Sequence, residues 1–349
     1  MMSDKKGHLL EVENLAVSFD TYAGEVQAVR GVGFHLDEGE TLAIVGESGS
    51  GKSVSMKMVM QLLDMPPARL KSGSVRYKGE EMTTKSDKEM EKYRGREFSM
   101  IFQDSMTGLN PTMRIGRQLC EGIIKHQKVS RAQAEKTAIE MLTQVGLPNP
   151  AAIYKRYPHT LSGGQRQRVM IAMAISCNPS ILFADEPTTA LDVTMQAQIL
   201  KLMRDLQKKT GTAIILVTHD LGVVASMADR ISVMYAGQII EAGTAQQVFY
   251  NPSHPYTWGL LGAMPNMIQE VKEELYSIPG TPPDLFAPPR GCAFAARCEY
   301  CLEACLKEEP GYYKCSDGHV SKCWLMDERA SEVKPPEGVY TRPRKEASV

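Results

Sequence analysis

The feature that most constrains this chain is a glycine-rich loop between an apolar run and a helix. The run covers residues 42–45, and the helix is expected over residues 53–63. The loop fits the pattern G-x-x-x-x-G-K-[ST] and comprises Gly46, Glu47, Ser48, Gly49, Ser50, Gly51, Lys52 and Ser53. Its glycines let successive N–H groups curl around phosphate oxygens, at a helix N-terminus that already favours anions. We therefore predict that this loop binds a nucleoside triphosphate.

Two side chains of the loop have chemistry of their own. Lys52 would reach the β- and γ-phosphates, and Ser53 would place its hydroxyl on Mg²⁺. A second Mg²⁺ ligand is predicted at Asp185, directly after the apolar run 181–184. The next residue, Glu186, could then polarise the attacking water as general base. Adjacent carboxylates also occur in solvated turns, but a phosphate loop in the same chain favours catalysis.

The remaining pattern predicts an α/β fold. Apolar runs at 42–45, 181–184 and 212–218 alternate with amphipathic helices, which is typical of a parallel sheet flanked by helices. Residues 104–177 interrupt this alternation and are mostly helical in pattern. We expect them to form a subdomain inserted between strands, with Ser130 capping one of its helices.

Composition excludes several classes of protein. The formal net charge of −1 argues against binding nucleic acid by bulk charge. No run approaches the roughly 18 consecutive apolar residues of a membrane span, and the N-terminal residues show no apolar signal segment. We therefore expect any membrane span to come from partner subunits.

A further motif reads L-S-G-G-Q from Leu161 and precedes a helix expected over residues 165–175, so it forms a second anion-binding turn. Together with the phosphate loop and residues 181–187, this motif resembles the ATP-binding cassette of ABC transporters. The resemblance covers residues 8–260 and implies that this turn serves ATP held by another subunit. The signature residues are Ser162, Gly163, Gly164 and Gln165.

The same resemblance implies roles for single residues. Gln103 corresponds to a catalytic glutamine that contacts Mg²⁺, and His219 to a histidine that hydrogen-bonds the γ-phosphate. Asp192 falls in the segment called the D-loop. Phe19 stands where the family has an aromatic side chain that stacks on adenine, with Tyr22 as the alternative.

The C-terminal part resembles one branch of this family. Segments 251–261, 278–285 and 289–298 are similar to the ATP-binding subunits of oligopeptide/dipeptide (and nickel) importers. The fold expected is therefore a P-loop ABC cassette over 8–260 with antiparallel edge strands and the helical subdomain. A Cys-rich extension over 261–330 and a disordered tail over 331–349 would follow it.

The resemblance implies an ATPase that powers peptide uptake at the cytoplasmic face of the cell membrane, as a peripheral protein. Its partners would be a second ABC ATPase subunit (a related chain or a copy), two permease subunits and an extracellular substrate-binding protein. Nucleic acid is not an expected partner. A nickel importer ATPase and a soluble DNA-repair-type ABC ATPase are the alternatives.

Six of the eight cysteines lie within residues 292–323, a clustering that indicates a metal or cluster site in a chain without a secretory signal. The family resemblance implies a [4Fe–4S] cluster bound by four of them, with Zn²⁺ or reduced thiols as alternatives. The four are Cys292, Cys298, Cys305 and Cys323. Two additional cysteines, Cys301 and Cys315, leave the ligand set open.

Overall fold

The computed structural model describes residues 7–103, 108–188, 191–264, 278–331, 333–336 and 339. The expectation of a disordered tail concerns residues that lie mostly outside this part of the chain. None of the helices in the described part is long and apolar enough to cross a membrane.

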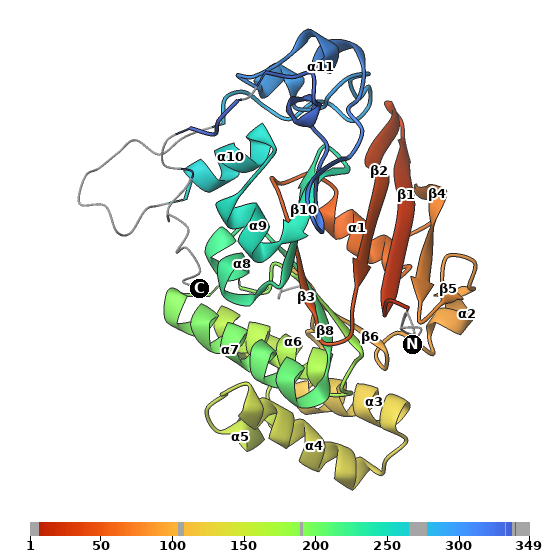
Figure 1. Ribbon diagram of the computed structural model, residues 1–349. Helices are drawn as coiled ribbons and strands as arrows, with labels where there is room; N and C mark the ends of the chain where they lie inside the picture. Colours follow the sequence, from red (N-terminus) through yellow and green to blue (C-terminus); the bar gives the residue numbers. More distant parts are fainter. Residues whose placement is uncertain are drawn as a thin grey trace, which may run out of the picture.

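The main sheet has eight strands in the order β11-β12-β10-β9-β3-β8-β7-β6 (Figure 1). Five of them are parallel, as the alternating pattern predicted: β3 (Thr41–Val45), β6 (Phe98–Ile101), β7 (Ile181–Asp185), β8 (Ala213–Thr218) and β9 (Arg230–Tyr235). The other three continue the sheet antiparallel: β10 (Gln238–Thr244), β11 (Tyr313–Ser316) and β12 (His319–Ser321).

Antiparallel strands also form a second sheet of four strands, in the order β2-β1-β4-β5. It consists of β2 (Gly24–Leu36), β1 (Leu10–Thr21), β4 (Ala68–Tyr77) and β5 (Glu80–Glu81). One apolar core joins this sheet to the main sheet and α1 (Lys52–Val59), through side chains such as Val17, Ile44 and Met56. The antiparallel part of the fold is therefore larger than the edge that the sequence predicted. The short helix α2 (Asp87–Met90) follows β5.

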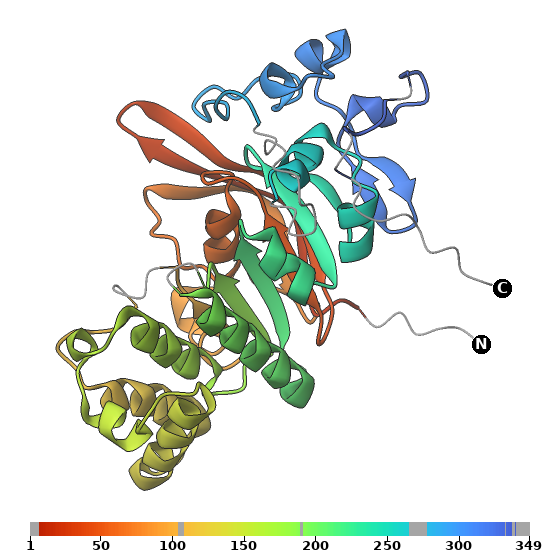
Figure 2. The ribbon, with the colours of Figure 1, turned by 90° about the vertical axis from the view of Figure 1, so that its left-hand side faces the viewer.

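The inserted helical subdomain is confirmed. It holds α3 (Ile115–Gln127), α4 (Arg131–Gln144), α5 (Pro150–Lys155), a 3₁₀ turn η1 (Pro158–Thr160) and α6 (Gly163–Ile175), at the lower left in Figure 2. Ser130 caps α4, because its Oγ accepts a hydrogen bond from the Gln133 N–H at 3.3 Å. A second apolar core, including Leu119, Val169 and Met203, joins these helices to the main sheet.

The remaining cassette helices are α7 (Val193–Thr210), α8 (Leu221–Met227), α9 (Ala245–Tyr250) and α10 (Pro255–Gly262). Gly211 ends α7 in the left-handed conformation (φ +71°), as its sequence position predicted. The helix expected over 53–63 is shorter, since α1 ends at Val59 and Gln61 takes a φ of +51°.

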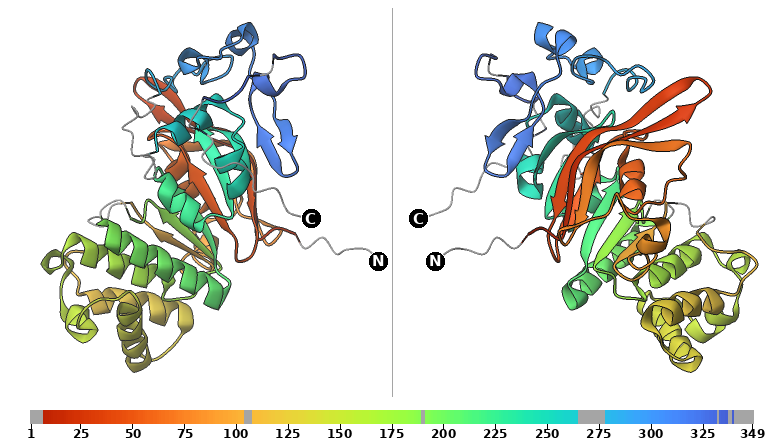
Figure 3. Two further views of the ribbon diagram at one scale, coloured as in Figure 1. Left: turned by 60° about the vertical axis from the view of Figure 1, so that its left-hand side comes forward. Right: turned by 90° about the vertical axis from the view of Figure 1, so that its right-hand side faces the viewer.

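The C-terminal extension contains a 3₁₀ turn η2 (Ala295–Arg297), helix α11 (Glu303–Lys307), the β11–β12 hairpin and a 3₁₀ turn η3 (Trp324–Met326). It lies over the β9–β10 end of the cassette (Figure 3). The extension packs on the cassette, because Ala293 and Phe294 share a third apolar core with Val45, Tyr235 and Tyr256.

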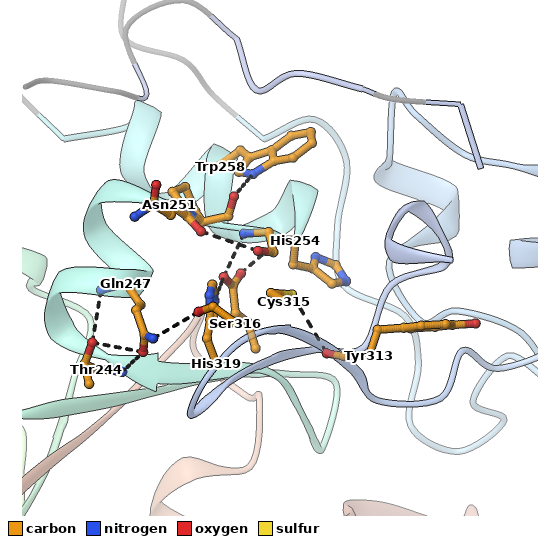
Figure 4. A network of polar contacts seen from close by, with 12 residues as sticks. Thr244, Gln247, Asn251, His254, Trp258, Tyr313, Cys315, Ser316 and His319 are labelled. Atoms are coloured by element: carbon orange, nitrogen blue, oxygen red, sulfur yellow. Dashed lines mark hydrogen bonds and ion pairs between the residues drawn. The ribbon is translucent and has the colours of Figure 1, made fainter. Parts of the chain in front are cut away.

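A buried polar junction fixes the hairpin to β10 (Figure 4). The His319 ring donates through Nε2 to Oε1 of Glu241 at 2.8 Å, and both side chains are almost fully buried. The Glu241 carboxylate also accepts the N–H groups of Ser253 (2.7 Å) and His254 (3.0 Å). Its charge is thus satisfied by three donors from two parts of the chain, as a buried carboxylate requires.

Candidate nucleotide-binding site

The phosphate loop is held tightly between neighbouring strands. Gly46 has a φ of +151°, and a Cβ there would lie 2.0 Å from the carbonyl oxygen of Met234 in β9. Gly51 has a φ of +99°, and its Cβ would lie 2.4 Å from the carbonyl oxygen of Ala28 in β2. Only glycine fits both positions, so the loop follows one path into the N-terminus of α1.

Lys52 folds back into this loop. Its Nζ donates hydrogen bonds to the carbonyl oxygens of Gly46 (2.8 Å) and Glu47 (2.7 Å) and approaches Oγ of Ser50 at 3.3 Å. Burial lowers the pKa of Lys52, while the nearby carboxylates of Glu186, Asp185 and Glu47 oppose that shift. The ammonium group therefore lies inside the curve of the loop, where a phosphate would replace the carbonyl oxygens as its partner.

Ser53 and Asp185 form the candidate magnesium site. The Oγ of Ser53 donates a hydrogen bond to Oδ1 of Asp185 at 2.8 Å, joining the start of α1 to the end of β7. Burial raises the pKa of Asp185, and the Ser53 hydrogen bond opposes the rise. A hydroxyl and a carboxylate side by side are suitable ligands for Mg²⁺, which prefers oxygen.

Glu186 lies between the other two residues predicted to be catalytic. Its Oε2 accepts a hydrogen bond from Nε2 of Gln103 at 2.9 Å, and its Oε1 lies 3.0 Å from Nδ1 of His219. The three residues follow β6, β7 and β8, which are adjacent parallel strands, so their carboxyl ends meet at one edge of the sheet. Glu186 has a positive φ of +46°, an uncommon conformation that is frequent at functional sites.

The signature turn lies apart from the phosphate loop. Ser162 caps α6, since its Oγ accepts the Gln165 N–H at 3.3 Å and the Gln165 side chain accepts the Ser162 N–H at 3.2 Å. A Cβ on Gly163 would meet nothing within 4 Å, so this face of the turn is open. Among the described residues, no hydrogen bond or ion pair joins residues 162–165 to residues 46–53. One chain therefore presents two separate anion-binding turns.

Asp192 caps α7 by accepting the Met195 N–H at 2.9 Å, which is a structural role in the isolated chain. The residues before it, 189–190, lie outside the described part. Phe19 is half-buried in β1, and Tyr22 is fully exposed in the β1–β2 turn. The choice between these two aromatics for stacking on adenine stays a prediction.

Two residues not singled out from the sequence contact the phosphate loop. The hydroxyl of Tyr256, in α10, accepts the Glu47 N–H at 2.8 Å. The guanidinium of Arg297, in η2, binds the Glu47 carboxylate through Nη1 (2.8 Å) and Nη2 (3.1 Å). Tyr256 and Arg297 both lie in segments that carried the family resemblance (251–261 and 289–298), but nothing local in the sequence indicates either contact.

Three of the four cysteines predicted as ligands, Cys292, Cys298 and Cys323, have raised pKa values. Burial raises the pKa of Cys292 to about 11 and that of Cys298 to about 12, and the charges of neighbouring sulfurs add to both shifts. Burial also raises the pKa of Cys323, with contributions from Cys292, Cys298 and Cys305. Charge on one sulfur of this segment therefore raises the pKa of Cys292, Cys298 and Cys323.

The sulfurs are nevertheless too far apart for a single ion. Among the described residues, only His8, His35 and Asp37 form a group of three possible ligands within 4.8 Å of one another. Four thiolates at about 2.3 Å from one Zn²⁺ would lie roughly 3.8 Å apart. Among the described residues, therefore, no three or four cysteine sulfurs lie close enough to hold one Zn²⁺ as they stand, and this arrangement shows neither a zinc site nor an iron–sulfur cluster.

The additional cysteines differ from each other. Cys301 lies beside Cys305. Burial is the main cause that raises the pKa of Cys301, and the Cys305 thiol raises it further. Cys315 is in β11, near Ser253 and Glu241, and its Sγ contacts the carbonyl oxygen of Tyr313 at 3.8 Å. The structure thus places Cys315 at the polar junction of Figure 4 and Cys301 beside Cys305.

Comparisons with known proteins agree with this geometry. Residues 29–189 match the family described as ABC transporter, and residues 240–305 match the oligopeptide/dipeptide transporter C-terminal region. The chain is 57% identical to the oligopeptide transport ATP-binding protein OppD of Bacillus subtilis (strain 168), over 97% of this chain and 95% of that protein. It is 52% identical to the dipeptide transport ATP-binding protein DppD of Lactococcus lactis subsp. cremoris (strain MG1363), over 98% and 97%.

Solved structures show the same fold. The dimeric post-hydrolysis state of the ATP-binding cassette MJ0796 bound to ADP and Pi aligns with a TM-score of 0.62 at 28% identity. It covers 68% of this chain and 98% of that cassette. The chain therefore belongs to the ATP-binding subunits of the oligopeptide/dipeptide family of ABC transporters.

Proposed function

We propose that this chain hydrolyses ATP to drive the import of dipeptides or oligopeptides. The observation that carries the proposal is the convergence of Gln103, Glu186 and His219 beside the Ser53–Asp185 pair. The relatives named for oligopeptide and dipeptide transport match nearly the whole chain, including the extension, which supports peptides as the cargo. Membership of this transporter family argues against a DNA-repair ATPase, and nickel remains the second candidate cargo.

In this mechanism the chain positions phosphate and water. Lys52 exchanges the carbonyl oxygens of its own loop for the β- and γ-phosphates. Mg²⁺, held by Ser53 and Asp185 with Gln103 nearby, would neutralise charge on the phosphates. Glu186 accepts a proton from the attacking water, and His219 donates to the γ-phosphate and keeps the Glu186 carboxylate oriented.

A complete site would need two chains. Among the described residues, no hydrogen bond or ion pair joins the Ser162 turn to the phosphate loop of its own chain, and the turn is open at Gly163. The turn is therefore suited to bind ATP held by a second cassette. Structures in the same fold include the dimeric structure of MJ0796, a bacterial ABC transporter cassette. The partner is a related ATP-binding chain or a second copy, and both attach to two permease subunits at the cytoplasmic face. An extracellular binding protein delivers the peptide.

For the extension, we propose a [4Fe–4S] cluster on Cys292, Cys298, Cys305 and Cys323. Four soft thiolates suit iron, and the larger cluster holds its ligands further apart than a single zinc ion does. Purification under anaerobic conditions should give a brown protein with about four irons per chain. Cys323→Ser should lower the iron content, while the control Cys315→Ser should retain it. A colourless protein that contains zinc would contradict the cluster.

Transport by the complete assembly tests the function. The chain, its partner ATPase and both permeases are reconstituted in vesicles with the binding protein. Labelled dipeptide and labelled nickel are then offered separately with ATP. Peptide uptake that requires ATP supports the proposal, whereas nickel uptake alone would favour the second candidate.

A further inference from the structure

The Cys-rich extension contacts the phosphate loop directly through Arg297. Both Nη atoms bind the Glu47 carboxylate, at 2.8 and 3.1 Å, and Nη1 also approaches the Tyr235 hydroxyl at 3.3 Å. Nε donates to the carbonyl oxygen of Pro279 at 2.8 Å. The planar guanidinium thus meets a carboxylate in the two-pronged geometry that arginine favours.

Arg297 is held firmly in place. Its side chain is only 6% exposed, against 27% for Glu47. It packs near the rings of Tyr235 (5.8 Å) and Phe294 (5.9 Å). Burial alone would lower the pKa of Arg297, but the hydrogen bonds to Glu47 and Tyr235 outweigh burial and raise it. Removing either partner would leave the other charge largely buried without compensation.

The partner of Arg297, Glu47, belongs to the loop that we propose binds phosphate, so the ion pair acts directly on that loop. Its N–H donates to the Tyr256 hydroxyl, and its carbonyl oxygen accepts from Lys52. When Lys52 turns towards phosphate, the loop loses that internal bond. The contacts from Arg297 and Tyr256 then hold Glu47 in position, together with the hydrogen bond from the Ser50 N–H to the Glu47 carbonyl oxygen at 3.3 Å.

The position of Arg297 in the sequence ties this contact to the extension's own fold. Arg297 immediately precedes Cys298, and its 3₁₀ turn begins three residues after Cys292. The Cys292 N–H in turn donates to the carbonyl oxygen of Cys305 at 2.8 Å. Any change that unfolds this cysteine segment would withdraw the guanidinium from the loop.

We propose that Arg297 is a positioning residue for ATP binding, which keeps the phosphate loop in its binding shape as long as the Cys-rich extension is folded around it. The proposal rests on the proposed nucleotide role of residues 46–53. In this proposal the extension is part of the ATP site. Arg297 acts on the phosphate loop through Glu47 and does not contact the nucleotide.

The test measures the affinity of the purified full-length chain for a fluorescent ATP analogue with Mg²⁺. Arg297→Gln should weaken binding about 5- to 20-fold, as expected for the loss of a coupling between two sites. Arg297→Lys, which retains the charge but cannot form the two-pronged contact, should recover only part of the affinity. The matched control is Arg329→Gln in the same extension, because Arg329 is exposed and pairs with the nearby Asp327. It should bind as the unchanged chain does.

A double substitution separates positioning from general stability. In a Glu47→Gln chain, adding Arg297→Gln should change the affinity by less than about twofold, because the partner charge has already gone. Independent, multiplying effects of the two substitutions would overturn the proposal. So would unchanged affinity in Arg297→Gln, or an equal loss in Arg329→Gln.

The remaining outcomes are also decisive. If Arg297→Gln does not fold, Arg297→Lys and Glu47→Gln still carry the test, and wild-type affinity in both would overturn the proposal. If the unchanged chain itself fails to bind the ATP analogue, the proposed function fails, which is a different result. Melting temperatures measured without nucleotide show whether a loss of affinity merely follows a loss of stability.

Discussion

The Nδ1 atom of His219 lies 3.0 Å from Oε1 of Glu186, while the other oxygen of that carboxylate accepts a hydrogen bond from Gln103. The two contacts fix the carboxylate from both sides, although Glu186 belongs to a turn with a positive φ. An oriented carboxylate at the carboxyl end of a central parallel strand is suited to align and deprotonate a water molecule. The geometry therefore distinguishes Glu186 from its neighbour Asp185, whose partner is Ser53.

Glu186→Gln should bind ATP with nearly unchanged affinity and lose hydrolysis by about 100-fold or more, the scale expected for removing a general base. The amide still accepts a hydrogen bond from Gln103 but cannot take a proton from water. ATP turnover by the assembled transporter and binding of a fluorescent ATP analogue measure the two effects. Glu38→Gln, at an exposed position outside the site, is the control. Turnover close to that of the control would show that Glu186 is not the base.

Asp185→Asn should separate nucleotide binding from magnesium binding. The substitution retains an oxygen near Ser53 Oγ but removes the negative charge that favours a divalent cation. We expect ATP to bind with similar affinity in the presence of Mg²⁺ and of a chelator, whereas the unchanged chain should bind more tightly with Mg²⁺. Titrations under both conditions measure this, with exposed Asp64→Asn as the control. A full magnesium effect in Asp185→Asn would place the ion elsewhere.

The parts of this site that the sequence predicted are those built by neighbouring residues. The phosphate loop, its strand and its helix are contiguous, and the order of turn residues alone indicates their shape. The contact between Arg297 and Glu47 joins residues 250 positions apart and depends on how η2 packs against β9 and α10. No local pattern encodes such packing, so the sequence did not predict the contact between the Cys-rich segment and the phosphate loop.

The β11–β12 hairpin was missed for a related reason. Its strands have four and three residues, too few to show a period of two. They are stabilised as strands by pairing with β10 and by the buried His319–Glu241 contact. The sequence shows no strand pattern here, and the partner that stabilises these strands lies about 80 residues earlier in the chain.

His319→Gln should therefore loosen the hairpin specifically. The substitution breaks a pair that is 2% and 0% exposed, and leaving the Glu241 charge poorly compensated should cost about 3 kcal/mol of unfolding free energy. Limited proteolysis should cut within residues 311–323 faster than in the unchanged chain. Lys314→Gln is the control, because Lys314 pairs with Asp317 at an exposed position of the same hairpin. Equal cleavage in both variants would contradict an anchoring role for His319.

His254 should make the folded chain sensitive to mild acid. Its Nδ1 accepts the Tyr256 N–H at 3.0 Å, and complete burial lowers its pKa to about 3. An unfolded histidine binds a proton below a pH of about 6.5. Between these values the unfolded state binds more protons than the folded state, so the free energy of unfolding falls as the pH falls. Stability is fully retained above about pH 6.5 and should drop by about 1.5 kcal/mol from this residue between pH 6.5 and 5.

His254→Asn provides the comparison for that effect. Asparagine can still accept the Tyr256 N–H at the start of α10 and does not titrate in this range. His35, whose pKa burial lowers to about 4, is present in both chains, so its contribution cancels in the difference. Denaturant unfolding at pH 7, 6 and 5 should show a steeper loss of stability in the unchanged chain than in His254→Asn. Parallel losses in the two chains would mean that His254 takes up a proton in the folded state and is less isolated from water than its burial indicates.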